Sequence, residues 1–186
     1  MARYAALLRG VNVNGVTVRS AELGELFRSL GFSGVKTVLA SGNVLFETDA
    51  AGGAGAAGAT GAAGHAALKA RIEQGLRDTF GYEAWIVLVD HGDLAAIVDG
   101  FPYPEVDERQ PYVVFASSPD VIEGLVSFAA GLAPAGGERA SRGPGVVYWE
   151  VPKGSSTDTV FSKHLAKASF KATTTTRNLR TLRKLL

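Results

Sequence analysis

The chain has no cysteine among its 186 residues, which excludes disulfides, thiolate metal sites and cysteine nucleophiles. It also has no uniformly apolar stretch of roughly 18 residues, so we expect no membrane-spanning helix. The first apolar run, residues 4–8, is shorter than a signal-peptide core and is followed by Arg9, so no export signal is expected. These absences predict a cytoplasmic protein.

Histidine is scarce as well. His65, His91 and His164 are the three present, and their spacing is not that of metal ligands. No Ser-His-Asp set and no carboxylate pair can be placed from spacing alone. We therefore predict no metal site and no cofactor, and the sequence leaves open whether the protein is an enzyme.

The net charge of +1 conceals an uneven distribution of charge. Residues 83–138 contain ten acidic residues and one basic residue, whereas residues 153–186 contain eight basic residues and one acidic residue. Such asymmetry can mark an anion-binding surface. Alternatively, the two regions complement each other within the fold or across a homodimer.

Hydrophobic periodicity predicts the elements of the first half. Apolar runs indicate strands at 4–8, 35–40, 43–48 and 84–89, and apolar residues at helical spacing indicate helices after Ser20 and around 68–80. Ser20 is the expected N-cap of the first helix, and Gly31 and Gly81 are the expected helix stops. The order strand, helix, strand, strand, helix, strand matches a ferredoxin-like split βαβ unit.

Residues 50–64 are alanine and glycine except for Thr60. Such a segment buries little surface and loses much backbone entropy on ordering, so a mobile surface loop is expected. Its alanines could extend the following helix backwards, but its six glycines argue against this.

The second half is less regular. Strands are predicted at 112–116, 138–142, 146–151 and 171–175, and helices at 93–98, 119–131, 159–168 and 178–186, the last of them basic. Three prolines predict an extended loop over 101–111, and Trp149 is expected in the core. The chain is thus predicted to be α+β, with two ferredoxin-like (βαββαβ-type) subdomains, 1–90 and 91–186.

Two polar turns in the first half are candidate binding segments. The turn after Arg9 contains Asn12 and Asn14 between glycines; its amides could form an anion-binding nest beside the arginine, or the asparagines could simply cap the turn. Ser41 and Asn43 belong to a hairpin turn. Since Arg9 ends the first strand and Asn43 starts the third, an antiparallel sheet would bring them together.

A third polar segment precedes the last helix. Arg177 and Asn178 could bind phosphate there, or Asn178 could be the N-cap of a helix whose basic residues suit its C-terminal end. We predict that the candidate residues line one polar cleft between the subdomains, with Arg177 and Asn178 at its rim. An RNA-recognition motif is not expected, because the first and third strands offer only Tyr4 and Phe46 as stacking aromatics.

These segments carry a family resemblance. The runs at 6–13, 41–46 and 176–178, together with Thr181, Phe101-Pro102 and Ser162-Lys163, resemble the bacterial family of unknown function DUF1697 over nearly the whole chain. The resemblance implies two ferredoxin-like subdomains, a soluble bacterial protein and no established activity. The chain departs from the usual pattern at Ala40, where glutamine is usual, and at Leu179, where tryptophan is usual.

The sequence therefore favours a binding module for an anionic ligand, which is a nucleotide, a phosphorylated metabolite or a nucleic acid. The first alternative is a small cofactor-independent enzyme in which Arg9 and Asn43 hold an oxyanion. The second is a protein-interaction module, which the acidic and basic regions would favour if they face each other between chains. No membrane partner is expected.

Overall fold

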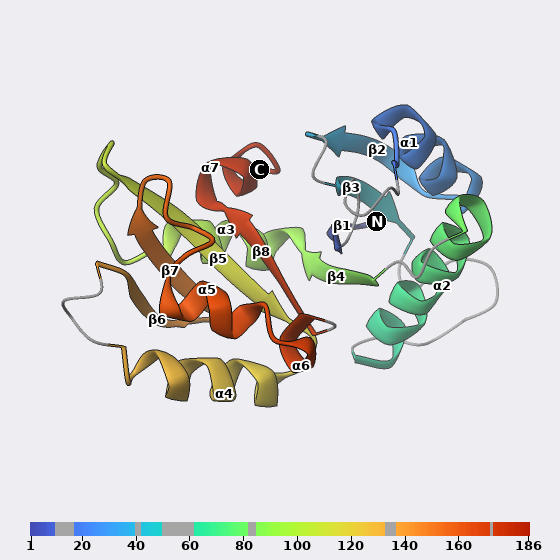
Figure 1. Ribbon diagram of the computed structural model, residues 1–186. Coiled ribbons are helices and arrows are strands. Elements are labelled where there is room, and N and C mark those ends of the chain that lie inside the picture. The colour runs from blue at the N-terminus through green and yellow to red at the C-terminus, as the bar shows by residue number, and fades with distance from the viewer. Residues whose placement is uncertain (10–16, 40–41, 50–61, 82–84, 133–136, 172) are drawn as a thin grey trace. The chain divides into compact units, whose positions relative to one another are not determined.

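The computed structural model describes residues 1–9, 17–39, 42–49, 62–81, 85–132, 137–171 and 173–186. The chain divides into two compact units (Figure 1). Unit 1 comprises residues 1–94 with Leu185, and unit 2 comprises residues 95–184 with Leu186. Both are mixed α and β structures, each with a four-stranded antiparallel sheet.

Unit 1 contains its elements in the predicted order. They are β1 (Ala2–Arg9), α1 (Ser20–Ser29), β2 (Ser33–Val38), β3 (Asn43–Thr48), α2 (Ala62–Phe80) and β4 (Trp85–Asp90), followed by the start of α3 (His91–Asp99). The strand order in the sheet is β2-β3-β1-β4. The predicted hairpin of β2 and β3 is confirmed, since the two strands pair antiparallel.

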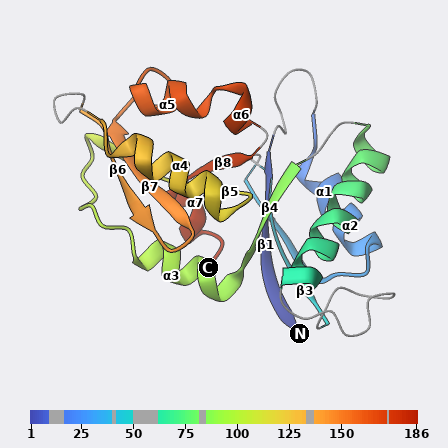
Figure 2. The same cartoon turned by 90° about the horizontal axis from the view of Figure 1, so that it is seen from below.

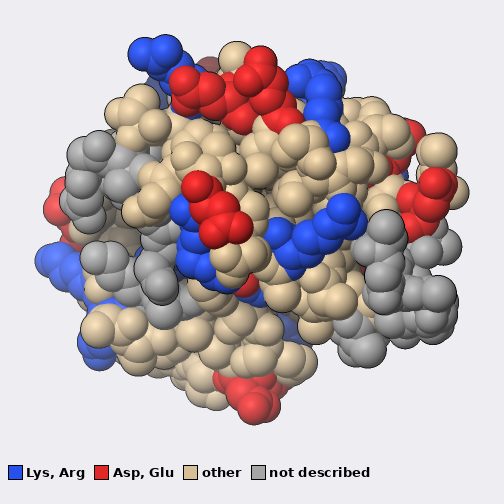
Figure 3. All heavy atoms as spheres, turned by 90° about the vertical axis from the view of Figure 1, so that its right-hand side faces the viewer, with Lys and Arg blue, Asp and Glu red and all other residues tan. Residues whose placement is uncertain are grey.

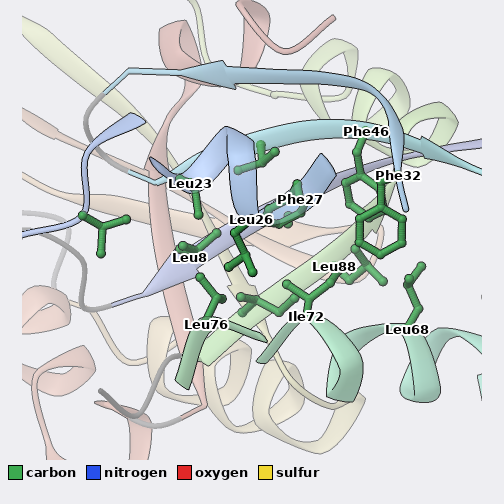
Figure 4. Close-up of a cluster of buried hydrophobic side chains, with 14 residues drawn as sticks. Leu8, Leu23, Leu26, Phe27, Phe32, Phe46, Leu68, Ile72, Leu76 and Leu88 are labelled. Atoms are coloured by element: carbon green, nitrogen blue, oxygen red, sulfur yellow. The ribbon is translucent and has the colours of Figure 1, made fainter. Parts of the chain in front are cut away.

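The core of unit 1 lies between the sheet and the helices α1 and α2 (Figure 4). Strand residues Ala6 and Leu8 face this core, and because side chains alternate along a strand, Leu7 and Arg9 lie on the opposite face. Phe32 and Phe46 are in ring contact at 4.6 Å between centroids. The helices contribute the apolar residues whose spacing predicted them: Leu23, Leu26, Phe27, Leu68, Ile72 and Leu76.

Two helix starts in unit 1 differ from the prediction. Ser20 is the first residue of α1, and Arg19 holds the N-cap position without a side-chain hydrogen bond, so the predicted serine cap is wrong. Helix α2 begins at Ala62, so residues 62–64 are helical and not part of the predicted loop. Alanine's high helix propensity outweighs the cost of one glycine there. Residues 50–61 lie outside the described residues.

Unit 2 contains the end of α3 and the second sheet. Its elements are β5 (Arg109–Ala116), α4 (Pro119–Ala129), β6 (Arg139–Gly143), β7 (Val146–Pro152), α5 (Val160–Leu165), α6 (Ala168–Lys171), β8 (Thr174–Asn178) and α7 (Leu179–Arg183). The strand order is β6-β7-β5-β8. Helix α4 packs across β5, β6 and β7 (Figure 2).

The core of unit 2 joins α4 and α5 to one face of its sheet. Its centre is Trp149, which is buried as predicted and contacts the rings of Tyr112 and Phe161. The indole N–H of Trp149 donates to Glu138 at 3.1 Å, and the other oxygen of this buried carboxylate accepts from the backbone N–H of Phe161 at 3.1 Å. Glu138 therefore ties the start of α5 to the sheet.

Several predicted bounds in unit 2 are wrong, including that of the last helix, which is predicted over 178–186 and observed as α7 (Leu179–Arg183). Strand β5 includes Pro111, which pairs with Glu150; this is possible because β8 pairs with β5 only from Tyr112 onward, so no partner there requires the missing N–H. The helix predicted over 159–168 is divided into α5 and α6. The strand predicted at 171–175 is β8, three residues later.

No helix among the described residues is long and apolar enough to cross a membrane. Acidic and basic side chains are interspersed over the face that carries α1 and α2, as Figure 3 shows.

Candidate functional site

The end of β1 and the start of β3 lie side by side in unit 1. In the register of these strands Leu7 is opposite Asn43, and the backbone N–H of Leu8 donates to the carbonyl of Gly42 at 2.8 Å. Arg9, the last residue of β1, therefore lies at the sheet end from which β3 starts. The topological argument made from the sequence holds for these two strand ends.

Asn43 is fully buried, with 0% of its surface exposed. Its side-chain Nδ2 donates to the carbonyl of Val38 at 2.9 Å, and Val38 is also its partner in the β2–β3 register. The amide thus closes the hairpin loop across its base. Asn43 has the role that turn chemistry predicts, which is to position the loop.

The loop that Asn43 closes has an unusual backbone conformation. Leu39 has a φ of +61°, the single positive value for a non-glycine residue in the described part of the chain, and its surface is 47% exposed. Gly42, at the other end of the loop, has a φ of +70°. An L-residue in the left-handed region costs energy, and such residues cluster at functional sites. Ser41, between these residues, lies outside the described residues, as do Asn12 and Asn14.

Arg9 is half-buried at this end of the sheet. Burial lowers the pKa of its guanidinium from the ordinary value, because desolvation disfavours the charged form. The pKa of an arginine is so high that the group stays charged at neutral pH. The end of β1 thus carries a partly desolvated cation.

Trp85 is the residue that sequence reasoning missed. It is the first residue of β4 and lies directly opposite Arg9 in the antiparallel pairing of β1 with β4. In the sequence, residues 84–89 form a continuous apolar run that predicts a strand, and such a run does not indicate which side chain lies beside which. The ferredoxin-like topology could have indicated Trp85, because in that strand order β1 lies between β3 and β4, so that the start of β4 lies beside the end of β1.

A lysine lies over the Trp85 ring. The Nζ of Lys69 in α2 is 4.5 Å from the ring centroid, a cation–π arrangement. Lys69 is held by an ion pair with Glu73, whose Oε1 also accepts from the backbone N–H of Ile86 at 3.1 Å. These contacts fix Lys69, Glu73 and the start of β4 relative to one another.

In unit 2, Arg177 and Asn178 are engaged in local hydrogen bonds. Arg177 is 8% exposed, and its Nη1 donates to Thr175 Oγ1 at 2.8 Å and to the carbonyl of Thr176 at 3.0 Å. Asn178 is the N-cap of α7, its Oδ1 accepting from the N–H of Arg180 at 2.9 Å. The N-cap interpretation of Asn178 is confirmed, and a cleft shared with Arg9 stays a prediction.

The acidic and basic regions meet within unit 2 at Glu105. Glu105, from the acidic region, pairs with Arg183 and with Arg180 Nε at 3.7 Å. The hydrogen bond from Arg183 holds the pKa of Glu105 below its usual value, against a smaller opposing effect of burial. At this position the two regions complement each other inside one chain.

The aromatic residues of β1 and β3 do not form an open stacking surface. Tyr4 and Phe46 are stacked on each other, with 5.8 Å between centroids, and both belong to the core that the helices cover. This placement agrees with the expectation that the sheet is not an RNA-recognition motif.

Two surface cavities lie at other places. One of about 440 Å³ in unit 1 lies between α1 and α2 beside Glu22, Glu25 and Phe80. One of about 340 Å³ in unit 2 lies beside Ser118 and the Glu123–Arg142 ion pair. No group of three or more His, Asp and Glu residues in the described chain is arranged to hold a metal ion.

Comparison with known proteins gives a family and a related fold. The sequence profile of a family described as "Protein of unknown function (DUF1697)" matches residues 1–148. The solved structure of the conserved bacterial protein SP0830 from Streptococcus pneumoniae is similar, with a TM-score of 0.75 and 24% sequence identity over 100% of this chain and 96% of that one. At this identity the similarity establishes the fold. No curated protein matches.

Proposed function

Because the chain belongs to the DUF1697 family, whose description assigns no function, we propose a function from its geometry: unit 1 binds an anionic ligand at the sheet end that carries Arg9. The ligand class is a nucleotide, a phosphorylated metabolite or a nucleic acid. The observation that supports this most is the half-buried guanidinium of Arg9 at the end of β1, next to the start of β3.

The chemistry of arginine fits this role. A guanidinium presents its N–H donors in a planar fork that matches phosphate and carboxylate, and the resulting hydrogen bonds are stronger than neutral ones. Partial burial strengthens them further, because water screens a desolvated charge less. In this proposal Arg9 binds the anion, and Asn12, Asn14 and Ser41 add polar contacts.

The supporting structure around Arg9 agrees with a site. Asn43 closes the loop that contains Ser41, and Leu39 holds a left-handed conformation in that loop while leaving an apolar side chain exposed. Local strain of this kind persists only where the surroundings enforce it. Its position at the same sheet end as Arg9 favours a functional loop over a plain connection.

The proposal extends to the fold and the location. The strand order β2-β3-β1-β4 with α1 and α2 packed on one face supports a ferredoxin-like description of unit 1, and we extend it to the less regular unit 2. A cytoplasmic location is part of the same proposal. The enzyme alternative requires a general acid or base beside Arg9. The protein-interaction alternative is less favoured, because Glu105 pairs with Arg180 and Arg183 within the chain.

The test compares two arginines of the same strand. Arg9→Ala should weaken the binding of inorganic tripolyphosphate by about 1.5–3 kcal/mol, the contribution of a hydrogen bond to a charged group. The matched control is Arg3→Ala, which removes the same charge from an exposed position at the other end of β1. Isothermal titration calorimetry measures both, and oligonucleotide binding should also weaken as salt is added.

Equal binding by Arg9→Ala and the unmodified protein would contradict the proposal. So would an equal loss in Arg3→Ala, since that result would indicate attraction by net charge alone. Urea unfolding of each variant separates loss of binding from loss of folding.

A further inference from the structure

The cavity of unit 2 lies where the end of β5, the hairpin of β6 and β7, and helix α4 meet. It has a volume of about 340 Å³, and its lining includes Ala116, the last residue of β5, and Gly145 in the hairpin. Small-molecule sites in proteins span roughly 300–1,000 Å³. The cavity is therefore at the lower end of that range and has the size for a small metabolite.

The position of this cavity in unit 2 corresponds to that of the candidate site in unit 1. The strand orders β2-β3-β1-β4 and β6-β7-β5-β8 match β5 with β1 and the β6–β7 hairpin with the β2–β3 hairpin. In unit 1 Leu7 is opposite Asn43, and in unit 2 Phe115 is opposite Val146, so each inner strand ends beside a hairpin. Unit 1 has Arg9 at this position, whereas unit 2 has both a cation and an anion. The two positions should therefore prefer ligands of different charge.

The cation and the anion of the cavity are Arg142 of β6 and Glu123 of α4. Arg142 Nη2 donates to Glu123 Oε2 in an ion pair whose side chains are 51% and 57% exposed. This hydrogen bond holds the pKa of Glu123 below its usual value, so the carboxylate is ionised at neutral pH. The other N–H groups of Arg142 and the second oxygen of Glu123 have no partner in the described part of the chain. Both groups can therefore bind a ligand while their ion pair stays intact.

The rest of the lining consists of hydroxyl and apolar groups. Ser118 is the N-cap of α4, but its side chain makes no capping hydrogen bond. The hydroxyl of Ser117 is likewise without a partner among the described residues. Ile122, which is 4% exposed, belongs to the core of unit 2, and with Pro119 it gives the cavity an apolar surface. A ligand in the cavity thus meets two uncommitted hydroxyls and an apolar surface beside the ion pair.

We propose that this cavity binds a free α-amino acid with an apolar side chain. Its carboxylate accepts hydrogen bonds from Arg142 and the serine hydroxyls, its ammonium group donates to Glu123, and its side chain packs on Ile122. A ligand with charge of one sign is attracted by one member of the ion pair and repelled by the other, whereas a zwitterion is attracted by both. The proposal is independent of anion binding at Arg9, because it concerns a different unit and different residues.

The experiment compares L-leucine with three analogues by isothermal titration calorimetry on the full chain. Isocaproate has the carboxylate and the apolar chain without the ammonium group, and isoamylamine has the ammonium group and the apolar chain without the carboxylate. Each should bind roughly 10- to 150-fold more weakly than leucine, which is the loss expected for hydrogen bonds to a charged group. Glycine, which lacks the side chain, should also bind more weakly, because it buries less apolar surface.

Two substitutions assign the two charged contacts. Arg142→Met should weaken the binding of leucine and isocaproate and should not weaken that of isoamylamine. Glu123→Gln should weaken the binding of leucine and isoamylamine and should not weaken that of isocaproate. Both variants should fold, because the ion pair is exposed. The matched control is Arg180→Met, which removes the charge of an exposed arginine paired with Glu105 in the same unit and should change no affinity.

The outcomes decide between this site and the alternatives. If isocaproate binds as tightly as leucine, the cavity is an anion site and the proposal is overturned. It is also overturned if leucine at millimolar concentration does not bind, or if Arg142→Met and Glu123→Gln bind leucine as tightly as the unmodified protein does. Arg9→Ala should leave leucine binding unchanged, and a loss in that variant would assign the binding to unit 1 and contradict the proposal.

Discussion

Units 1 and 2 differ in how they use buried polar groups. In unit 2 the buried set includes Glu138, Glu150 and Arg177. In the described part of unit 1 it consists of the neutral residues Asn43 and Thr48. Unit 2 therefore has charged residues in its interior. In unit 1 the charged residue of the candidate site is Arg9, which lies at the end of the sheet.

The two arginines of the candidate site show the same contrast. Arg177 is buried and donates to Thr175 and to the carbonyl of Thr176 on its own strand. Arg9 is half-buried at the end of its strand, beside Trp85. The comparison teaches that two arginines at strand ends can differ in burial and in the residues paired beside them.

The largest expected effect tests the charged framework of unit 2. Glu150 is 1% exposed and accepts hydrogen bonds from Arg109 and, at 2.7 Å, from Arg139 Nε. Glu150→Ala should lower the free energy of unfolding by about 3 kcal/mol, the lower end of the range for breaking a buried pair, because both arginines also reach solvent. Urea unfolding of the full chain measures this.

Glu123→Ala is the control for that variant, since Glu123 pairs with Arg142 at an exposed position. It should leave the unfolding midpoint unchanged. If Glu150→Ala unfolds at the same midpoint as Glu123→Ala, the buried network does not stabilise unit 2 and the contrast between the units is wrong.

The next effect concerns the neutral framework residue of unit 1. Asn43→Ala leaves the carbonyl of Val38 without its 2.9 Å donor and should cost about 1–3 kcal/mol of stability. Because Asn43 closes the loop beside Arg9, the variant should also weaken tripolyphosphate binding. Thr159→Ala, which removes the N-cap of α5, should cost about 1 kcal/mol and leave binding unchanged. If both variants bind tripolyphosphate more weakly, the loss of binding follows from lower stability and not from the position of Asn43.

A smaller effect depends on pH and is confined to unit 2. The ring of His164 is stacked on Phe128 at 3.6 Å between centroids and contacts Phe170. Desolvation, with a smaller contribution from Lys167, lowers the pKa of His164. The unfolded chain then binds a proton at a higher pH than the folded chain, so stability is fully present above about pH 6.5 and falls as the pH drops below it.

His164→Phe keeps the stacking and removes the titration. Thermal unfolding at several pH values between about 7.5 and 5 should show a flatter dependence for this variant than for the unmodified protein. His65→Gln is the matched removal of a histidine from unit 1. An unchanged slope in His164→Phe would show that His164 does not cause the pH dependence.

The smallest effect is expected in the alanine- and glycine-rich segment of unit 1. Replacing residues 50–61 with a four-residue turn should change the free energy of unfolding by less than about 1 kcal/mol, because the entropy of loop closure depends only weakly on length. Residues 62–64 are kept, since they form the first turn of α2. A large loss of stability on thermal unfolding would show that the segment packs against the unit.

Much of the local structure could be predicted because local patterns decide it. The strand 43–48 and the helix stops at Gly31 and Gly81 follow from alternation and from glycine's tolerance of positive φ, and the structure has them at these positions. Pro111 was placed outside the sheet because proline lacks an N–H. It lies within β5 because the pairing of β5 with β8 starts only at the next residue, Tyr112, which no local pattern shows.

The candidate site was predictable only in part. Arg9 and Asn43 could be brought together from the sequence, because an antiparallel arrangement of the first and third strands determines which ends meet. The burial of Asn43 and its bond to Val38 could not, since they depend on the conformation of the loop. Trp85 was missed because a continuous apolar run does not indicate which face of the sheet each side chain occupies.

The sequence by itself determined the order of helices and strands in unit 1, the apolar core positions and the family, because periodicity and motifs are properties of neighbouring residues. Only the tertiary structure decided which polar residues are buried and which residues they contact. Arg177 and Asn178 are similar in type to Arg9 and Asn43, yet Arg177 is more buried than Arg9 and Asn43 is fully buried, and each has its own neighbours in the sheet. Register, burial and strand pairing depend on residues that are far apart in the chain, so they are defined only once the sheet has formed.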